Sequence, residues 1–258
     1  MTAPLLKVSH LTKSFGGLTA VQDFSLTLTE QSLHALIGPN GAGKTTVFNL
    51  LTAVYQPDKG DVALAGKRLT GLRPYQIAQA GMARTFQNIR LFRELSVLEN
   101  VRVACHLRCP HGMPAAIFRT RGHRAQEAAI TQRCTDLLKT FNLANRAHEQ
   151  ARNLPYGDQR RLEIARAIAT GPRVLLLDEP AAGMNPQEKK ELRVLIRSIR
   201  DRFALAILLI EHDMGVVMDL CERITVLDYG KTIAEGPPEK VQKDPKVIEA
   251  YLGAPAAL

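Results

Sequence analysis

The most constraining feature of this 258-residue sequence is the glycine-rich stretch Gly38-Pro39-Asn40-Gly41-Ala42-Gly43-Lys44-Thr45-Thr46. Its pattern is G-x-x-x-x-G-K-[ST], which is typical of a loop that binds nucleotide phosphates. The apolar segment 33–37 precedes it and is short enough for a buried strand, while apolar residues recur at helical spacing over 47–54. Strand, loop and helix thus follow in the order that the motif requires, which predicts an α/β fold.

The residue types of this loop suit the binding of phosphate groups. Glycines let backbone N–H groups close around phosphate oxygens, and the helix that follows directs the positive end of its dipole at the same anion. Lys44 would neutralise the terminal phosphates, and the hydroxyl of Thr45 would bind Mg²⁺. We therefore expect a bound nucleotide together with Mg²⁺.

Polar residues follow two strongly apolar segments further along the chain. Asp178 and Glu179 come after 174–177, which is too apolar for a strand with one exposed face and therefore indicates a central parallel strand. His212 follows the apolar segment 204–210 in the same way. The carboxyl ends of such strands bind ligands, so Asp178 could hold Mg²⁺ and Glu179 could polarise a water molecule. Without the glycine-rich loop, a helix cap and a solvated histidine would be the simpler interpretations.

Three more candidates have weaker signals of their own. Phe15 precedes a Gly pair in a turn and could be a core residue or a platform for a nucleobase. Gln87 is a lone glutamine in an extended segment, where a solvated side chain is the usual outcome. The segment 154–159 leads into an amphipathic helix near Gly157, which could be an anion site or an ordinary junction.

Composition restricts the function classes. The formal charge of +9 and the pI near 9.6 suggest an acidic partner, such as a nucleotide, a nucleic acid or an anionic membrane surface. Nucleic acid is the weaker candidate because no zinc-finger or RNA-recognition signature occurs and only 5% of the residues are aromatic. No apolar run approaches the roughly 20 residues of a membrane span, and the first residues do not resemble a secretory signal. We expect a soluble, cytoplasmic protein.

Four cysteines, Cys105, Cys109, Cys134 and Cys221, have no paired arrangement, which favours reduced, buried thiols. A metal site at Cys105, Cys109 and His111 is conceivable, but their spacing matches no zinc pattern.

The distribution of elements predicts two parts. Alternating residues over 5–28 indicate antiparallel strands, and another hairpin is expected around 62–64. A capping box at Ser96-Val97-Leu98-Glu99 begins a helix-rich middle section that includes a basic insertion over 108–124. We therefore assign 1–87 and 170–258 to a nucleotide-binding core with an N-terminal antiparallel β subdomain, and 88–169 to an α-helical subdomain.

The order of these segments resembles that of the ATP-binding subunits of ABC transporters over nearly the whole chain. The resemblance implies the ABC ATPase fold, a P-loop NTPase core with a mostly parallel sheet, and it implies ATP and Mg²⁺ as ligands. It gives each segment a role: adenine stacking for Phe15; ATP binding for Gly38 to Thr46; catalysis for Glu179, His212 and Gln87; Mg²⁺ binding for Thr45, Gln87 and Asp178; and a signature that binds the ATP of a partner subunit for Leu154, Pro155, Tyr156, Gly157, Asp158 and Gln159.

The chain looks most like the longer of the two ATPases of branched-chain amino-acid importers, in the segments 82–92, 156–166, 181–186, 210–214 and 247–253. It departs from the broad ABC pattern at Pro155, where a serine is usual. Proline has neither a hydroxyl nor an N–H, which puts the usual contact with the γ-phosphate in question. It also has Asn185 where aspartate is commoner, and a helix cap accounts for that residue.

The resemblance implies a peripheral ATPase subunit on the cytoplasmic face of the inner membrane, coupling ATP hydrolysis to uptake of branched-chain amino acids. Its partners would be integral-membrane permease subunits, a second ATPase subunit in a homodimer or heterodimer, and a periplasmic or extracellular solute-binding protein, with no nucleic acid. Urea or amide uptake, lipid export, and a soluble ABC-type ATPase acting on nucleic acid or ribosomes stay open. A nucleotide kinase would leave the signature and His212 without a role.

Overall fold

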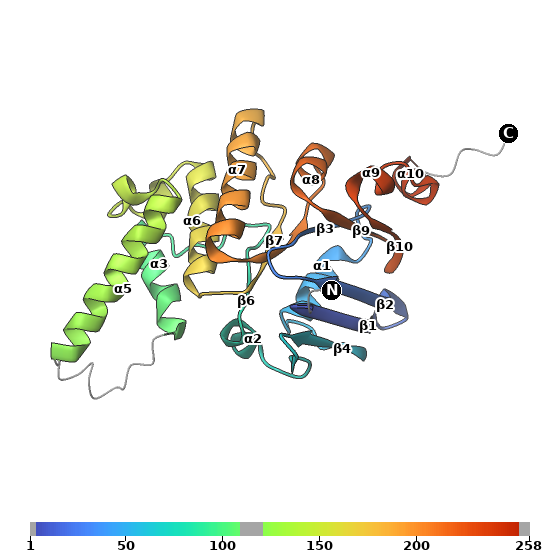
Figure 1. Cartoon of the computed structure of the whole chain (residues 1–258), viewed down its shortest axis with the longest axis horizontal. Coiled ribbons are helices and arrows are strands. Elements are labelled where there is room, and N and C mark those ends of the chain that lie inside the picture. The colour runs from blue at the N-terminus through green and yellow to red at the C-terminus, as the bar shows by residue number, and fades with distance from the viewer. Residues whose placement is uncertain (1–3, 109–120, 253–258) are drawn as a thin grey trace. The chain divides into compact units, whose positions relative to one another are not determined.

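The computed structural model describes residues 4–108 and 121–252, and the chain forms two compact units (Figure 1). One unit comprises Met1–Arg84 and Arg173–Leu258, and the other comprises Thr85–Pro172. These boundaries lie three residues from those expected from the sequence, 87/88 and 169/170. Cys109 and His111, two residues of the conceivable metal site, lie outside the described residues.

The first unit is built on a six-stranded sheet in the order β10-β9-β3-β8-β7-β6. All neighbouring strands are parallel except β10 and β9, which are antiparallel. Every residue of β3, β7 and β8 is buried, as expected of apolar strands that are covered on both faces. The strands are β3 (Leu33–Ile37), β6 (Met82–Arg84), β7 (Val174–Asp178), β8 (Ala206–Ile210), β9 (Arg223–Asp228) and β10 (Lys231–Gly236).

Helices cover both faces of this sheet (Figure 1). Helices α1 (Lys44–Leu51) and α2 (Pro74–Ala80) lie on one side, and α7 (Pro186–Phe203) and α8 (Met214–Leu220) on the other. Two short helices, α9 (Pro238–Val241) and α10 (Pro245–Leu252), follow β10. This arrangement confirms the predicted fold class, a mostly parallel sheet between helices.

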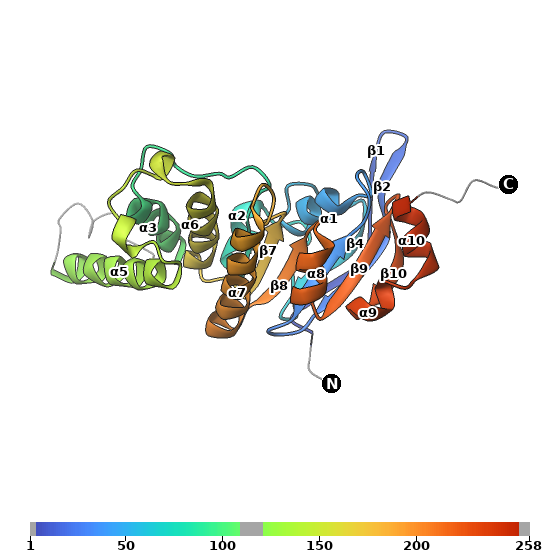
Figure 2. The same ribbon diagram turned by 90° about the horizontal axis from the view of Figure 1, so that it is seen from above.

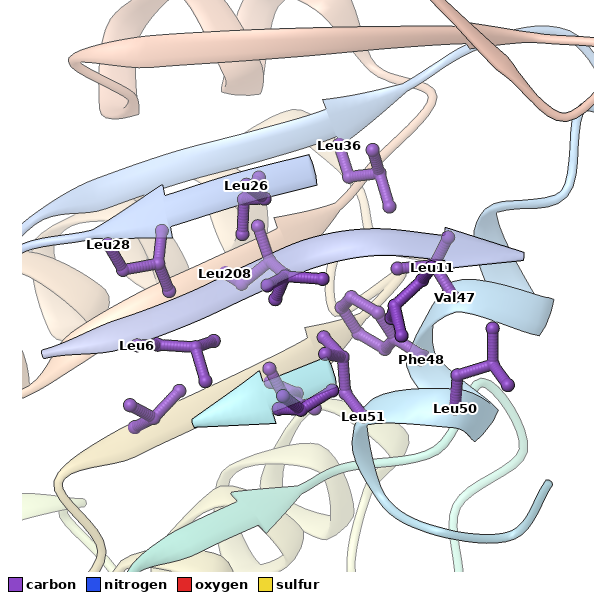
Figure 3. Close-up of a cluster of buried hydrophobic side chains, with 14 of the residues drawn as sticks. Leu6, Leu11, Leu26, Leu28, Leu36, Val47, Phe48, Leu50, Leu51 and Leu208 are labelled. Atoms are coloured by element: carbon purple, nitrogen blue, oxygen red, sulfur yellow. The ribbon is translucent and has the colours of Figure 1, made fainter. Parts of the chain in front are cut away.

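A second, antiparallel sheet completes the first unit, with the order β2-β1-β4-β5. Its strands are β1 (Leu6–Phe15), β2 (Leu18–Leu28), β4 (Lys59–Leu64) and β5 (Lys67–Arg68). Figure 3 shows its leucines packed with residues of α1 and of the parallel sheet, including Phe48 and Leu208. Each such side chain contributes roughly 1.5–3 kcal/mol through burial, so α1 is held firmly between the two sheets.

The second unit is helical. Its helix α3 (Val97–Cys105) packs against both α5 (Arg121–Thr140) and α6 (Tyr156–Ala169), as Figure 2 shows. Short 3₁₀ turns lie at η1 (His106–Arg108), η2 (Ala144–Arg146) and η3 (Ala151–Asn153). The predicted capping box is confirmed: Ser96 and Glu99 bond reciprocally at the start of α3.

Helix α5 begins at Arg121, within the range 108–124 that we expected to be a basic loop or a loosely helical insertion. Helix α8 buries Val216, Val217 and Leu220, and Cys221 follows the helix in an extended conformation. Among the described residues, no helix is long and apolar enough to cross a bilayer.

Candidate nucleotide site

The glycine-rich loop joins the end of β3 to the start of α1. Two of its glycines are required by their surroundings. A Cβ on Gly38 would lie 2.0 Å from the carbonyl oxygen of Leu227, and one on Gly43 would lie 2.4 Å from that of Ala20. Both glycines also have positive φ, 149° and 101°. The loop is therefore closely packed on its inner side, and its glycines have the backbone geometry that a phosphate-binding loop needs.

Lys44 is folded back onto this loop. Its Nζ donates hydrogen bonds to the carbonyl oxygens of Gly38, at 2.7 Å, and Pro39, at 2.8 Å. Burial lowers the pKa of Lys44, while the nearby carboxylates of Glu179 and Asp178 act in the opposite direction. The ammonium group thus lies between the loop and the acidic strand end. Thr45 is exposed on the first turn of α1.

Asp178, the last residue of β7, is buried in an ion pair with Arg84 of the neighbouring strand β6, with 2.7 Å between Oδ2 and Nη2. Arg84 also donates to Oδ1 of Asn49 on α1, at 2.6 Å, and its guanidinium lies 5.3 Å from the ring centroid of Phe48. Sequence reasoning missed Arg84 as a link between β7 and α1. A basic residue directly after Met82 and Ala83, at the end of β6, was the available signal.

Glu179 and His212 lie together. The distance from Nε2 of His212 to Oε1 of Glu179 is 2.7 Å. The contact follows from the sheet, because β7 and β8 are parallel neighbours with Asp178 opposite Ile210, so the residues after each strand meet at one edge. Glu179 has a φ of 46°, which is uncommon for a residue with a Cβ. Its own N–H donates to the carbonyl of Ile210, which holds the backbone in this conformation.

A second carboxylate, Glu211, organises the same edge and was also missed from the sequence. It is buried and accepts hydrogen bonds from the N–H groups of Ala181, at 2.7 Å, His212, at 3.0 Å, and Asp213, at 3.4 Å. Burial raises the pKa of Glu211, and these backbone donors oppose that shift. Glu211 therefore ties the segment after β8 to the segment after β7.

Of the remaining predicted residues, Phe15 also lies in the first unit. Its side chain is 43% exposed at the end of β1, so it is not a core residue, and it packs edge-to-face with Tyr55 at 5.1 Å between ring centroids. Gln87 and the segment 154–159 belong to the helical unit. There Pro155 is the N-cap of α6, and Nε2 of Gln159 donates to the carbonyl of Leu154 at 2.8 Å.

The cysteines within the described residues are free and buried, as expected: Cys105, Cys134 and Cys221. The structure also places Sγ of Cys105 3.3 Å from Sγ of Cys134, a proximity that their sequence spacing did not suggest. In the part of the chain that the structure describes, no three His, Cys, Asp or Glu side chains cluster as a metal site.

Fold and site together define an ATP-binding cassette, and comparison with known proteins agrees. The family model described as ABC transporter matches residues 21–182. This chain belongs to the ABC transporter family and is an ATPase of that family. A second model, described as branched-chain amino acid ATP-binding cassette transporter, matches residues 231–257.

Two relatives and one solved structure are similar to this chain over nearly its whole length. The chain is 49% identical to the high-affinity branched-chain amino acid transport ATP-binding protein LivG of Escherichia coli K12, over 98% of this chain and 99% of the relative. It is 46% identical to the corresponding protein BraF of Pseudomonas aeruginosa, with the same coverage. Among solved structures, the ADP conformation of an ATP-binding cassette of an ABC transporter matches with a TM-score of 0.84 and 28% identity, over 98% of this chain and 100% of that chain.

Proposed function

We propose that this chain is the ATP-hydrolysing subunit of an importer of branched-chain amino acids. The observation that carries the catalytic assignment is the contact between Glu179 and His212 at the sheet edge that also bears the glycine-rich loop. The solute class rests on the near-full-length similarity to ATP-binding proteins of branched-chain amino acid transport.

The residues of the loop would hold the phosphates of ATP. Its backbone N–H groups and Lys44 bind and neutralise the anion, and Phe15 stacks on the adenine. Mg²⁺, when bound, neutralises developing charge on the phosphates. Thr45, Asp178 and Gln87 are the residues that would hold it, and their oxygen atoms suit this cation.

Glu179 would accept the proton of the attacking water as the new P–O bond forms and the bond between the β- and γ-phosphates breaks, which yields ADP and phosphate. His212, through its contact with Oε1, orients the carboxylate of Glu179. Glu211 keeps His212 in place through the backbone. The left-handed backbone of Glu179 directs the side chain away from the course of an ordinary strand.

The far side of the γ-phosphate would be bound by the signature of a second ATPase subunit. Pro155 cannot supply the usual serine hydroxyl, so we assign this contact to backbone N–H groups from Gly157 onward, at the start of α6. The subunit pair would bind permease subunits at the cytoplasmic face of the membrane, and an external binding protein would deliver the solute.

The catalytic assignment is tested with Glu179→Gln. We expect at least a roughly 100-fold lower turnover, because a general base commonly contributes that much, with ATP affinity unchanged and the subunit pair stabilised by ATP. The measurements are phosphate release, equilibrium ATP binding and the oligomeric state. Glu239→Gln, at an exposed position of α9, is the control and should retain activity. Undiminished turnover of Glu179→Gln would remove this residue as the base.

The solute is tested by reconstituting the chain with the permease and binding protein that co-purify with it. Uptake of labelled leucine, isoleucine and valine, but not urea or an amide, is expected. The main alternative is lipid export, because the chain is also 33% identical to the lipopolysaccharide export ATP-binding protein LptB of Haemophilus influenzae. ATPase activity stimulated by nucleic acid would instead indicate a soluble ABC-type ATPase.

A further inference from the structure

Two charged side chains are completely enclosed on α6, the helix that begins at the signature segment 154–159. Arg160 and Glu163 are 0% and 2% exposed, and Nη1 of Arg160 lies 2.8 Å from Oε2 of Glu163. Enclosing an ion pair is costly unless its remaining polar atoms are hydrogen-bonded. The other hydrogen-bond partners of Arg160 and Glu163 therefore indicate the role of this ion pair.

Those partners lie in the segment 86–90, which contains Gln87. Arg160 donates to the carbonyl of Phe86 through Nη1, at 2.7 Å, and to the carbonyl of Gln87 through Nη2, at 2.8 Å. Glu163 Oε1 accepts from the N–H groups of Phe86, at 3.3 Å, and Arg90, at 3.2 Å. The two side chains thus hold this segment through four backbone hydrogen bonds, and bonds to charged groups are the stronger kind.

Arg160 also contacts the signature itself. Its Nη2 donates to the hydroxyl of Tyr156 at 3.3 Å, and its guanidinium lies 6.0 Å from the ring centroid of Tyr156. Tyr156 is one of the signature residues, and its side chain is 45% exposed at the first turn of α6. A single guanidinium therefore joins a signature residue to the backbone of Gln87.

We propose that Arg160 and Glu163 are positioning residues for ATP hydrolysis: they join the segment 86–90 to the signature helix so that Gln87 and the signature move as one body. This inference rests on the roles proposed above for Gln87 and for 154–159. The motion that brings the signature to the ATP of a partner subunit then also carries Gln87. Because the pair lies wholly in the helical unit, whereas the loop 38–46 belongs to the other unit, it acts on turnover and not on the first binding of ATP.

The test compares Arg160→Met with Arg102→Met. Arg102 forms an ion pair with Glu127, at 2.7 Å, that joins α3 to α5 in the same unit, so Arg102→Met controls for the loss of an arginine and its ion pair from this unit. For Arg160→Met we expect at least a tenfold lower kcat, an ATP dissociation constant within twofold of the unsubstituted protein, and faster hydrogen exchange of the amides of Phe86 and Arg90. Arg102→Met should melt earlier but keep kcat within twofold. Equal kcat losses in both variants would overturn the proposal.

Arg160→Lys is the second variant, in case the methionine variant fails to fold. Lysine keeps a cation for Glu163 but lacks the planar fork that reaches two carbonyl groups. If both variants fold, the kcat of Arg160→Lys should lie between that of the unsubstituted protein and that of Arg160→Met. If only Arg160→Lys folds, its kcat should be well below that of the unsubstituted protein. An unchanged kcat in a folded Arg160→Lys would contradict the proposal.

A double-variant experiment shows whether the effect passes through Gln87. If it does, Arg160→Met combined with Gln87→Ala should turn over no more slowly than Gln87→Ala alone, whereas multiplied losses would show that Arg160 acts elsewhere. If the proposed catalytic roles of Glu179 and Gln87 are themselves wrong, the outcome differs: Glu179→Gln and Gln87→Ala would both retain full kcat. If those two lose activity while Arg160→Met does not, only the positioning role fails.

Discussion

Two histidines illustrate how residues of one type acquire different roles from their positions on the sheet. His34 lies within β3 and is enclosed on all sides, with Nε2 2.8 Å from the hydroxyl of Thr225. His212 lies just beyond the end of β8 and contacts Glu179. Burial lowers the pKa of His34 to about 4, with smaller opposing and reinforcing contributions from Glu235 and Arg223. The first histidine is therefore part of the core and stays neutral, while the second is available to the proposed site.

The position of His34 predicts how stability depends on pH. Its pKa in the folded state lies below the unfolded value of 6.5, so the unfolded chain takes up the proton first as the pH falls. Stability contributed by the neutral form is fully present above pH 6.5 and is lost as the pH falls from there toward 4. We expect the titration of His34 to lower the free energy of unfolding by about 2 kcal/mol between pH 7 and pH 5.

The measurement is urea unfolding at both pH values for the unsubstituted protein and for His34→Gln, which cannot titrate. The variant should be less stable at pH 7 but should show a smaller loss toward pH 5. Parallel pH profiles for the two proteins would mean that His34 titrates equally in the folded and unfolded states.

At the scale of elements, the helices differ in how their first N–H groups are satisfied. Helices α3 and α7 begin with reciprocal capping boxes, Ser96 with Glu99 and Asn185 with Glu188. The N-cap residue of helix α1 is Gly43, which has no side chain to cap the helix. In α3 and α7 the cap side chains accept hydrogen bonds from backbone N–H groups of the first turn. No side chain caps the start of α1, so its first N–H groups can bind the phosphate that we propose.

This difference predicts the effect of Gly43→Ala. The added Cβ would lie 2.4 Å from the carbonyl of Ala20 at a φ of 101°, so the start of α1 and the loop must shift. Backbone strain of about 1–3 kcal/mol should weaken ATP binding roughly tenfold. The control is Gly66→Ala, which also has positive φ but no atom within 4 Å of the new Cβ. Calorimetric titration with ATP should find normal affinity in the control, and an equal loss in both variants would contradict this account of the loop.

At the scale of the whole molecule, the proposed site is incomplete in a single chain. The loop, Glu179 and His212 all belong to one unit, whereas the signature segment belongs to the helical unit and would serve the ATP of another subunit. We therefore predict that specific ATPase activity rises with protein concentration, because the second subunit must associate by mass action. Phosphate release per chain, measured over a wide dilution series alongside sedimentation, checks this. Constant specific activity of a monomer throughout would contradict it.

The sequence by itself determined the features that depend on local order. The loop motif between an apolar strand and an amphipathic helix predicted the fold class and the place of Lys44. The two capping boxes at Ser96 and Asn185 predicted helix starts that the structure confirms. The rule that the carboxyl ends of parallel strands meet at one edge placed Asp178, Glu179 and His212 at the same edge of the sheet. These predictions worked because each depends on residues that are neighbours in the chain or on a general property of sheets.

Only the tertiary structure decided which distant side chains meet. The 2.7 Å contacts of His212 with Glu179 and of Arg84 with Asp178 depend on the order of the strands, which the sequence leaves open. Likewise, Arg160 reaches the backbone of Gln87 across a separation of 73 residues, and nothing in the local pattern of either segment encodes that meeting. Hydrophobic periodicity predicts which face of an element is buried, but the partner of a buried charge follows from packing between elements.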